Sequence, residues 1–456
     1  MQLERLMMTR PLSQADILGL SAEGAGVVLL PKFAFDAGSG ATSSTAAAFR
    51  SASNERPEFV PTEQHAAARL EALGLQEVAA SDLRSDLTGS LSESQGVFAR
   101  FNALGLTAAY FRDRAHVDGA RDALSDEFEV VPNFSLALPS RMRDPNVQAA
   151  RGATMPGSPT WPSASGVAGA HAQNIKGSGV LVGVLDTGID ADHHQFAARP
   201  VPFRYVSFNP HNPASASRNV RGFDTDGHGT HVCGIISGAT IGVAPEAELM
   251  VASVIESETA RTSLIRVVYG LNWLLQEFIS SENARKPALV NLSLGFPSTG
   301  MPSISKAEYN MRLSAIETVL KTLVQANVLP IVAIGNDGPG KYGYPGGFSD
   351  ALGVGAVDMN GVIAGFSGSR LGRPRKPDLY GYGVDIYSSY ERDSLNQSFY
   401  ETLSGTSMAA PYVTGVAALY LCRQPSLSAK ALRTMLLQNA LSIKNGNRIT
   451  KIARYL

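Results

Sequence analysis

The sequence LSGTSMAAPYVTG, residues Leu403–Gly415, places a serine where a helix is predicted to begin. Gly405 is expected to form a turn that delivers Ser407 to a helix of small residues, from about Met408 to Cys422. Pro411 fits the first turn of this helix, where its missing N–H would have no partner. Free N–H groups and the helix dipole favour negative charge near the serine. Serine is a weak nucleophile, so a base and a group that orients the base are expected elsewhere.

The composition is that of a globular protein. The chain of 456 residues is 44% hydrophobic and contains 44 glycines, and its length favours up to three domains. A net charge of −1 gives no indication of a nucleic acid or a membrane surface as partner. The N-terminus lacks the apolar segment of a signal peptide and no run is long enough to span a membrane, so a cytoplasmic location is expected, with secretion by another route as the alternative. Cys233 and Cys422 are expected to be buried free thiols, with a single disulfide as the alternative.

The first third of the chain is predicted to form a small α+β domain. Residues 1–22 are a lead without clear periodicity, and residues 139–160 are a linker rich in Pro, Gly, Ser and Ala. Residues 23–138 follow the order β-α-β-β-α-β of a ferredoxin-like two-layer domain, interrupted by a flexible insert at 34–60. The strands and helices expected in this region are 26–33, 62–73, 97–102, 106–111, 115–124 and 128–138.

Residues 161–456 are predicted to form an α/β domain. Continuous apolar runs are typical of strands that are buried on both faces of a parallel sheet. These runs are 180–185, 249–254, 288–294 and 328–334, with helical patterns at 264–279 and 306–325 between them. Alternating strands and helices indicate a doubly wound, mostly parallel sheet with helices on both faces. A last helix at 429–439 is followed by a short tail.

Two polar residues, Asp186 and His228, stand where functional groups are expected in such a sheet, at the end of a strand or the start of a helix. Asp186 ends the first apolar run, where functional groups gather at the carboxyl ends of strands, although a cap or turn aspartate is the alternative. His228 lies between two glycines in DGHGTHVCG and begins a predicted helix. His231 forms an HxxH pair with it, but the glutamate of HExxH is missing, so a hydrogen-bonded structural histidine is favoured over a metal ligand. His193 and His194 are expected at the surface.

The order Asp, His, Ser occurs in subtilisin, whereas other folds carry these residues in other orders. The segments DTGID around Asp186, HGTH around His228 and SGTSMAAP around Ser407 resemble the three signature segments of the subtilisin-like serine protease family. The resemblance covers about 161–456 and implies a serine endopeptidase of subtilisin-like fold. Asn336 in IVAIGNDGPG matches the asparagine of the family's oxyanion hole, with the Ser407 N–H as second donor. By itself, Asn336 would be interpreted as a turn residue.

The resemblance implies a mechanism that needs no cofactor. His228 takes the Ser407 proton during attack on a peptide carbonyl, Asp186 orients the imidazole, and the acyl-enzyme is then hydrolysed by water. The calcium-binding insertion that many family members carry after the histidine helix is missing, because SGATIGVAPEAEL leads directly into the next strand. No metal site is predicted, and the sequence leaves a weak structural calcium site open. KPDLYGYGVDI replaces the family's usual PDIVAPG segment, which leaves the local loop geometry open.

Substrate recognition is also implied by resemblance. The residues expected to line the primary specificity pocket are Ser293, Leu294, Gly295, Ala333, Gly335 and Gly343. Glycine at position 343 leaves room for a bulky substrate side chain. Asp337, Glu256 and Glu258 border the expected cleft and would favour Lys or Arg in the substrate, or else are solvated loop charges.

By order and position, the small domain resembles the family's inhibitory propeptide. This implies that 128–138 pairs with the enzyme surface, that 139–155 leads toward Ser407, and that self-cleavage falls within about 136–156. The expected partners are a peptide or protein substrate and the chain's own N-terminal domain. An independent domain that recruits substrate is the alternative.

Three other functions compete with a general endopeptidase. A dedicated leader-peptide processing protease or a transpeptidase would use the same triad. A non-catalytic binding module is disfavoured, because Asp186, His228, Asn336 and Ser407 are all retained. An esterase on the α/β-hydrolase fold is disfavoured, because its serine would come first and within GxSxG.

Overall fold

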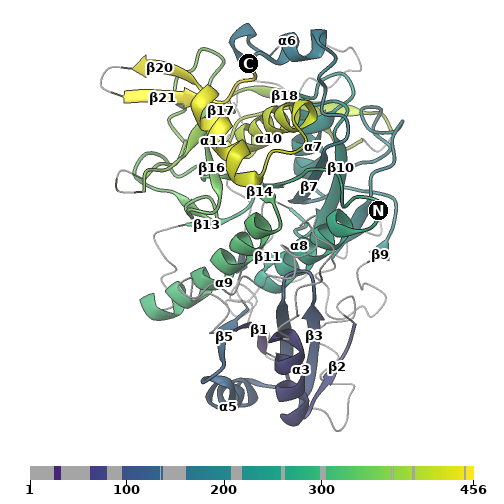
Figure 1. Ribbon diagram of the computed structural model, residues 1–456, viewed down its shortest axis with the longest axis vertical. Helices are drawn as coiled ribbons and strands as arrows, with labels where there is room; N and C mark the ends of the chain where they lie inside the picture. Colours follow the sequence, from purple (N-terminus) through teal and green to yellow (C-terminus); the bar gives the residue numbers. More distant parts are fainter. Residues whose placement is uncertain are drawn as a thin grey trace.

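A computed structural model of the chain contains two sheets of different construction (Figure 1). The residues that the structure describes are 25–31, 62–79, 95–133, 135–136, 161–206, 218–257, 262–297, 305–370, 372, 374–392, 396–445 and 448–456. The lead, the insert and the linker lie outside the described residues, so the domain boundaries remain predictions.

The large sheet has ten strands in the order β20-β21-β17-β16-β14-β12-β7-β10-β8-β9. They are β7 (Leu181–Asp186), β8 (Phe203–Tyr205), β9 (Arg218–Asn219), β10 (Glu248–Ser253), β12 (Ala288–Leu292), β14 (Val328–Ala333), β16 (Leu352–Val357), β17 (Leu379–Tyr382), β20 (Leu441–Asn445) and β21 (Arg448–Ile452). Neighbouring strands are parallel except for the pairs β8–β9 and β20–β21 at the two edges. The doubly wound, mostly parallel architecture is confirmed.

Helices cover both faces of this sheet (Figure 1). They are α6 (Val167–Ala172), α7 (His228–Ser237), α8 (Leu264–Ile279), α9 (Lys306–Gln325), α10 (Thr406–Arg423) and α11 (Ala429–Asn439), with a short 3-10 turn η2 (Ser163–Ser165). Because side chains alternate along a strand, Val182 and Val184 pack in the core with α7 and α10, whereas Leu181 and Leu185 pack with α8 and α9. Burial on both faces explains why the strand is continuously apolar.

The C-terminal region differs from the prediction. The expected short tail is wrong, because β20 and β21 form a hairpin, and Ile452 of β21 pairs with Tyr380 of β17. A second hairpin that the sequence did not predict, β18 (Ile386–Tyr390) with β19 (Phe399–Leu403), leads directly into α10. The helix begins at Thr406, two residues earlier than expected, so Ser407 lies in its first turn.

The small sheet has five strands in the order β2-β3-β4-β1-β5. Its elements are β1 (Ala25–Pro31), α3 (Thr62–Ala72), β2 (Leu75–Glu77), β3 (Gly96–Phe101), β4 (Leu106–Phe111), α5 (Arg114–Leu124) and β5 (Phe128–Pro132). Most pairs are antiparallel, and only β2 and β3 run parallel. A small α+β domain is confirmed, with β2 as an additional strand. The expected strand 128–138 is divided into β5 and β6 (Ser135–Leu136).

The two faces of the small sheet have different partners. Val27 and Leu29 pack with α3 and α5 in a core that belongs to the small domain alone. Val28, Leu30 and Phe101 face the other way, into a core that they share with α8 and α9 of the large domain. Figure 1 shows these two helices between the two sheets. The small domain therefore closes its second face only by docking on the large one.

Polar contacts reinforce this docking. Ala103 N–H donates to Asn272 Oδ1 on α8 at 3.1 Å, and Ile265 N–H at the start of α8 donates to Asn133 Oδ1 at 3.1 Å. Each domain thus supplies one side-chain amide that accepts a backbone N–H of the other domain.

The small domain also adds a strand to the large one. Leu136 of β6 pairs antiparallel with Thr262 of β11 (Thr262–Ser263). The Thr262 hydroxyl donates to the carbonyl oxygen of Val254, the residue that follows β10. The last described strand of the small domain therefore lies near the carboxyl edge of the large sheet.

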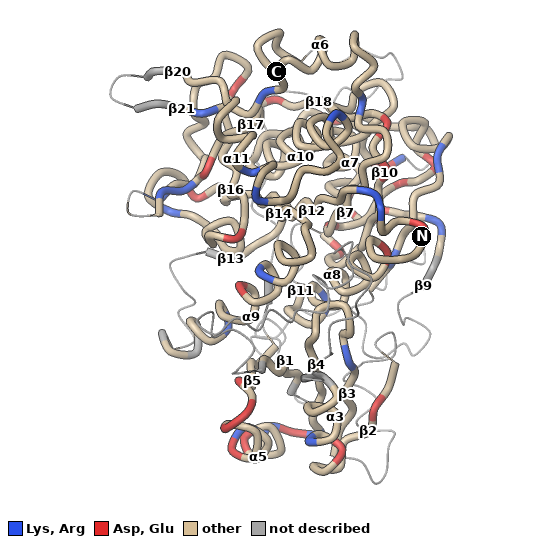
Figure 2. Tube along the Cα trace, in the orientation of Figure 1, with Lys and Arg blue, Asp and Glu red and all other residues tan. Residues whose placement is uncertain are grey.

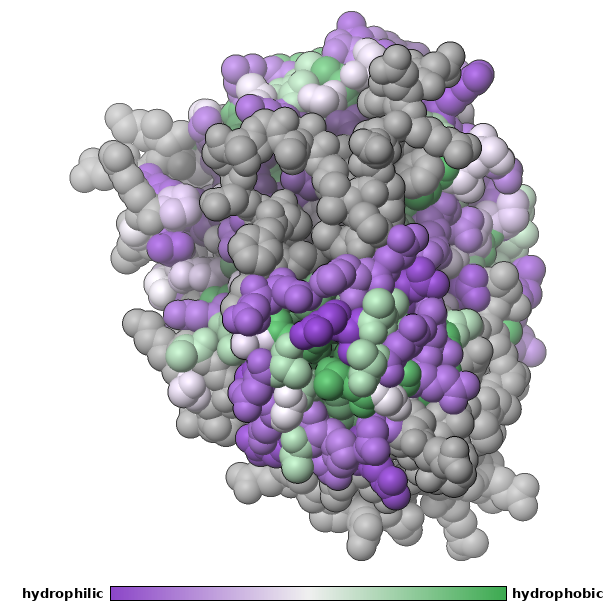
Figure 3. Space-filling model, turned by 60° about the horizontal axis from the view of Figure 1, so that its bottom comes forward, coloured by the Kyte–Doolittle hydropathy of each residue, from purple (hydrophilic) through white to green (hydrophobic). Residues whose placement is uncertain are grey.

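The surface separates charged from uncharged elements. Charged residues lie mainly on loops and outer helices, whereas α7 contains none and α10 only Arg423 at its end (Figure 2). No helix in the described part of the chain is long and apolar enough to cross a membrane. Figure 3, turned to bring the small domain forward, shows hydrophobic surface surrounded by hydrophilic residues. A cavity of about 380 Å³ on this domain is lined by Leu73, Gln95, Phe111, Ala115, His116, Gly119 and Ala120, none of them a predicted site residue.

Candidate active site

Asp186 and His228 meet at the carboxyl edge of the large sheet. Asp186 is the last residue of β7 and His228 the first of α7, and both side chains are fully buried. His228 Nδ1 lies 2.6 Å from Asp186 Oδ1, which also accepts the N–H of Thr187 at 2.8 Å. This contact fixes the imidazole so that Nε2 is on the side away from the carboxylate. Nε2 has no hydrogen-bond partner in the structure.

The start of α7 is held by Asp224, which the sequence prediction missed. Its carboxylate accepts the N–H groups of Gly227 at 3.0 Å and Thr230 at 2.7 Å, and the Thr230 hydroxyl. Gly227 has a φ of 88°, a left-handed conformation that favours glycine. The usual preference for Asp just before a helix was the available signal for this residue.

The loop after Asp186 packs tightly on the same helix. Gly229 N–H donates to Thr187 Oγ1 at 2.8 Å. A Cβ atom at Gly229 would lie 2.1 Å from the carbonyl oxygen of Gly188, so the backbones approach too closely for any side chain there. The glycine that follows His228 is therefore required for the contact between the histidine helix and the aspartate loop.

Ser407 lies in the first turn of α10 and is 1% exposed. Its Oγ has no hydrogen-bond partner in the structure. Buried polar atoms without partners cost free energy, and in native proteins they call for an explanation such as a catalytic role. Asp186 Oδ2, His228 Nε2 and Ser407 Oγ are three such atoms at one edge of the sheet.

Asn336 lies beside the start of the helix that carries Ser407. Asn336 Oδ1 accepts both the N–H and the hydroxyl of Thr406, each at 2.9 Å, which fixes the amide. A Cβ atom at Gly405 would lie 3.3 Å from Asn336 Nδ2 and 3.6 Å from Ser407 N. Gly405 therefore lies close to both nitrogens, and a side chain there would crowd Asn336 Nδ2.

The predicted pocket residues lie on segments that follow two neighbouring strands, β12 and β14. Ser293, Leu294 and Ala333 are buried, and Gly343 pairs with Pro297 of β13 (Phe296–Pro297) within β15 (Gly343–Tyr344). A Cβ atom at Gly335 would lie 3.4 Å from Gly343 N, and one at Gly295 would lie 2.4 Å from Tyr344 O. The structure brings these segments together, and their role in binding substrate remains a prediction.

The three acidic residues expected at the cleft are not equivalent. Glu256 forms a bidentate ion pair with Arg266, with Oε1 to Nη2 at 2.7 Å and Oε2 to Nη1 at 3.0 Å. Its charge is therefore compensated within the protein. Asp337 is exposed, and its Oδ2 lies 4.0 Å from where a Cβ of Gly335 would stand. Glu258 lies outside the described residues.

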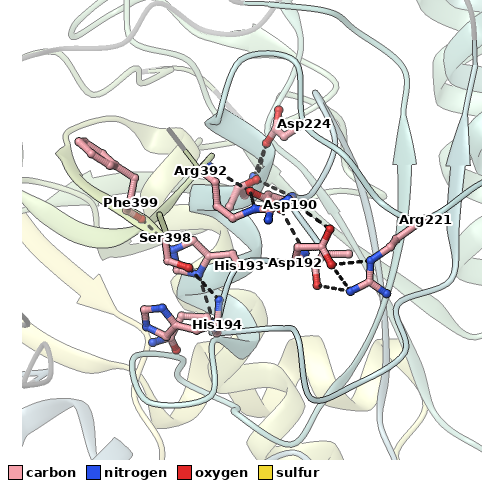
Figure 4. Close-up of polar contacts among 12 residues, drawn as sticks. Asp190, Asp192, His193, His194, Arg221, Asp224, Arg392, Ser398 and Phe399 are labelled. Carbon is pink, nitrogen blue, oxygen red and sulfur yellow. Dashed lines mark hydrogen bonds and ion pairs between the residues drawn. The ribbon is translucent and has the colours of Figure 1, made fainter. Parts of the chain in front are cut away.

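Two further histidines, His231 and His193, bind the hairpin β18–β19. His231 Nε2 lies 3.1 Å from the carbonyl oxygens of both Ile386 and Glu401, so its hydrogen-bonded structural role is confirmed. The surface position predicted for His193 is wrong, because the side chain is fully buried. His193 Nε2 donates to Phe399 O at 2.8 Å (Figure 4). Burial lowers the pKa of His193 to about 4.

Ion pairs join the same hairpin to the loop after Asp186 (Figure 4). Arg392 Nε lies 2.9 Å from Asp190 Oδ2, and Arg392 Nη2 lies 3.1 Å from Asp192 Oδ2. Arg221 pairs with Asp192 from the other side. The hairpin that leads to Ser407 is thus tied to the loop that follows Asp186.

Both cysteines are free thiols, as predicted. Cys233 is buried in α7, where desolvation raises the pKa of its thiol well above the ordinary value. Cys422 is half-buried near the end of α10.

Comparisons with known proteins show which proteins this chain is similar to. A family profile described as "Subtilase family" matches residues 177–453. "Subtilisin-like protease PopC" of Myxococcus xanthus (strain DK1622) is 50% identical over 352 residues, covering 76% of this chain and 74% of that protein. "M-protease" of Shouchella clausii (strain KSM-K16) is 34% identical over 339 residues, 71% of this chain and 78% of that protein. "Subtilisin Savinase" of Lederbergia lenta is 35% identical over 283 residues, 61% of this chain and 89% of that protein.

Proposed function

The chain belongs to the subtilase family and is a subtilisin-like serine protease, and on this basis we propose that Asp186, His228 and Ser407 are its catalytic triad. The observation that carries the proposal is the 2.6 Å contact between buried His228 Nδ1 and Asp186 Oδ1, with Nε2 left unpaired. An imidazole held in this way has one nitrogen available to accept the proton of a serine hydroxyl.

Each group then has one task in peptide hydrolysis. His228 Nε2 takes the Ser407 proton as Oγ attacks the peptide carbonyl, and Asp186 stabilises the imidazolium that forms. The Asn336 amide and the Ser407 N–H donate to the oxyanion. His228 protonates the leaving amine, and water then hydrolyses the acyl-enzyme. Every step uses groups of the chain itself, so the mechanism calls for no cofactor.

The small domain is proposed to be an intramolecular inhibitor of this site. The second face of its sheet is covered by α8 and α9, and this burial favours the state in which the small domain is docked on the large one. Its strand β6 adds to β11 close to the carboxyl edge of the sheet, the mode in which extended peptides bind sheet edges. Release by self-cleavage within about 136–156 would make the chain a self-inhibited precursor.

A phosphonate probe that reacts with serine nucleophiles tests the triad directly. The wild-type chain should be labelled on Ser407, and Ser407→Ala should not be labelled. Ser404→Ala is a matched control, because Ser404 lies three residues earlier and its hydroxyl instead donates to Asp385 Oδ1 at 3.2 Å. If Ser407 of an active preparation stays unlabelled while the protein cleaves peptides, the triad assignment is wrong.

Intact-mass measurement tests the inhibitor role. The wild-type chain should be cut within about 136–156, whereas Ser407→Ala should keep its full length. The purified fragment that contains the small domain should then inhibit the separated enzyme. A fragment that leaves peptide cleavage unchanged would favour a domain that recruits substrate.

A further inference from the structure

The carbonyl oxygen of Ser407 cannot form its regular helix hydrogen bond. In an α-helix this oxygen accepts the N–H of the residue four positions later. That residue is Pro411, which has no N–H, although it lies within α10. The oxygen instead accepts the hydroxyl of Ser293 at 3.1 Å. A residue from the segment after β12 thus replaces a hydrogen bond that the helix has lost.

The Ser293 hydroxyl belongs to a chain of buried polar groups. Asn291 Nδ2 donates to Ser293 Oγ at 3.2 Å, and Thr414 Oγ1 donates to Asn291 Oδ1 at 3.0 Å. Asn291, Ser293 and Thr414 are all 0% exposed. Buried polar side chains weaken a core unless they are paired, so an asparagine within the apolar strand β12 calls for a reason.

We propose that Ser293, held in place by Asn291, is a positioning residue for Ser407. The inference rests on the proposed role of Ser407 as nucleophile. By binding the carbonyl oxygen, Ser293 fixes the peptide unit that follows Ser407, and with it the direction of the serine side chain. The hydroxyl of Ser293 therefore contacts the backbone of the proposed nucleophile, while the residue also belongs to the predicted wall of the specificity pocket.

Thr406, the residue before Ser407, is held independently. Asn336 Oδ1 binds the N–H of Thr406, and the Thr406 hydroxyl accepts Gly335 N–H at 3.2 Å. Ser293 follows β12 and Asn336 follows β14, and these two strands are neighbours. The nucleophile is held between the ends of two adjacent strands. A misplacement of about 1 Å can cost roughly 100-fold in rate, so a lost anchor should be measurable.

The first variant is Ser293→Ala. We expect phosphonate labelling of Ser407 and kcat to fall about tenfold, the equivalent of one hydrogen bond, with KM changed less than about twofold. Pro411→Ala restores an N–H four residues after Ser407, which can donate to the same oxygen. In the Pro411→Ala background, Ser293→Ala should therefore cost less than about threefold. A merely structural role of Ser293 would show no such rescue.

A matched control is Ser237→Ala. Ser237 is also fully buried, and its hydroxyl donates to a backbone carbonyl, that of Ala247, at 2.7 Å, but at the far end of α7. This variant should lower the melting temperature and leave the labelling rate unchanged. If Ser293→Ala yields no folded protein, Ser293→Cys, whose thiol is a weaker donor, should show the same direction of change and the same rescue.

Two results would overturn the inference: a wild-type labelling rate in the Ser293 variant, or a loss that is equally large in the Pro411→Ala background. Failure of the proposed triad would look different, because wild-type Ser407 itself would then remain unlabelled.

Discussion

The two sheets of this protein differ in how their faces are covered. The ten-stranded sheet is closed on both faces by helices of its own domain, α7 and α10 on one and α8 and α9 on the other. The five-stranded sheet has its own helices on one face only. Parallel strands need crossover connections, which place helices on both faces, whereas antiparallel strands are joined by short turns. The large domain is thus complete in itself, and the small one needs a partner surface.

The small domain and two of the proposed catalytic residues lie on different faces of the large sheet. The small domain packs on α8 and α9, whereas His228 and Ser407 begin helices on the opposite face. Among the described elements of the small domain, only β6 reaches toward the carboxyl edge of the large sheet, where His228 and Ser407 lie. Substitutions in the shared core should therefore weaken docking, and substitutions at the sheet edge should change the reaction rate.

The largest effect is expected from two phenylalanines of β3. Phe98 and Phe101 are both fully buried, Phe98 in the small domain's own core and Phe101 in the shared core. Each change to Ala should cost about 3–5 kcal/mol. Both changes are made in a Ser407→Ala background, so that the chain is not cut. In Phe98→Ala, the backbone amides of α3 and α5 should lose their protection from hydrogen exchange. In Phe101→Ala the same helices should stay protected while contacts with α8 are lost. Equal loss of protection in both variants would contradict the division into two cores.

The next effect concerns the sheet edge. Asn336→Asp retains Oδ1, which binds Thr406, but replaces the Nδ2 donor. The expected loss in kcat is the factor known for the same donor in subtilisin, roughly 10²–10³. Steady-state kinetics on a peptide substrate measures it, and the melting temperature should change little. A variant that keeps more than a third of wild-type kcat would exclude Asn336 from the oxyanion hole.

Acid should weaken the large domain through His193. Burial holds its pKa at about 4, below the ordinary value of 6.5. Between these values the unfolded chain binds a proton that the folded chain does not, so stability is lost as the pH falls from about 6.5 to 4. The loss should reach about 2 kcal/mol by pH 5. The groups around the ring include Asp190, His194, Arg392, Tyr400, the Gln195 N–H and the Phe399 carbonyl.

Urea unfolding at pH 7 and pH 5 measures this loss. His193→Gln lacks the titrating ring and should lose about 2 kcal/mol less than wild type over the same interval. Equal pH dependence in both proteins would show that other groups cause the acid sensitivity.

The smallest expected effect is on substrate preference, and it should differ between two acidic residues. Exposed Asp337 is free to favour Lys or Arg in the substrate, whereas Glu256 is already paired with Arg266. Asp337→Asn should reduce that preference about two- to fivefold in a peptide library, and Glu256→Gln should leave it unchanged. A shift caused by Glu256→Gln alone would show that its ion pair opens to substrate.

Much of the fold follows from local sequence patterns. Helices 228–237, 264–279, 306–325 and 429–439 agree with the structure to the residue or nearly so, because each combines apolar periodicity with a clear start. Asp186, His228, Asn336 and Ser407 were likewise visible, since each stands directly beside a buried strand or a helix start within a short motif. The hairpin β20–β21 was not predicted, because a short edge strand of five residues leaves little pattern in the sequence until the strand it pairs with is known.

The sequence by itself determined which groups are proposed to carry the chemistry, because strand ends and helix starts are set by residues close together in the chain. Tertiary structure alone decided how those groups are supported. The hydroxyl of Ser293 meets a carbonyl 114 residues away, and His193 is buried beneath a hairpin 206 residues away. Tertiary structure also decided that the charge of Glu256 is paired with that of Arg266. It decided as well that α8 and α9 cover the second face of the small sheet. Such contacts depend on packing between distant segments, which no local pattern of residues encodes.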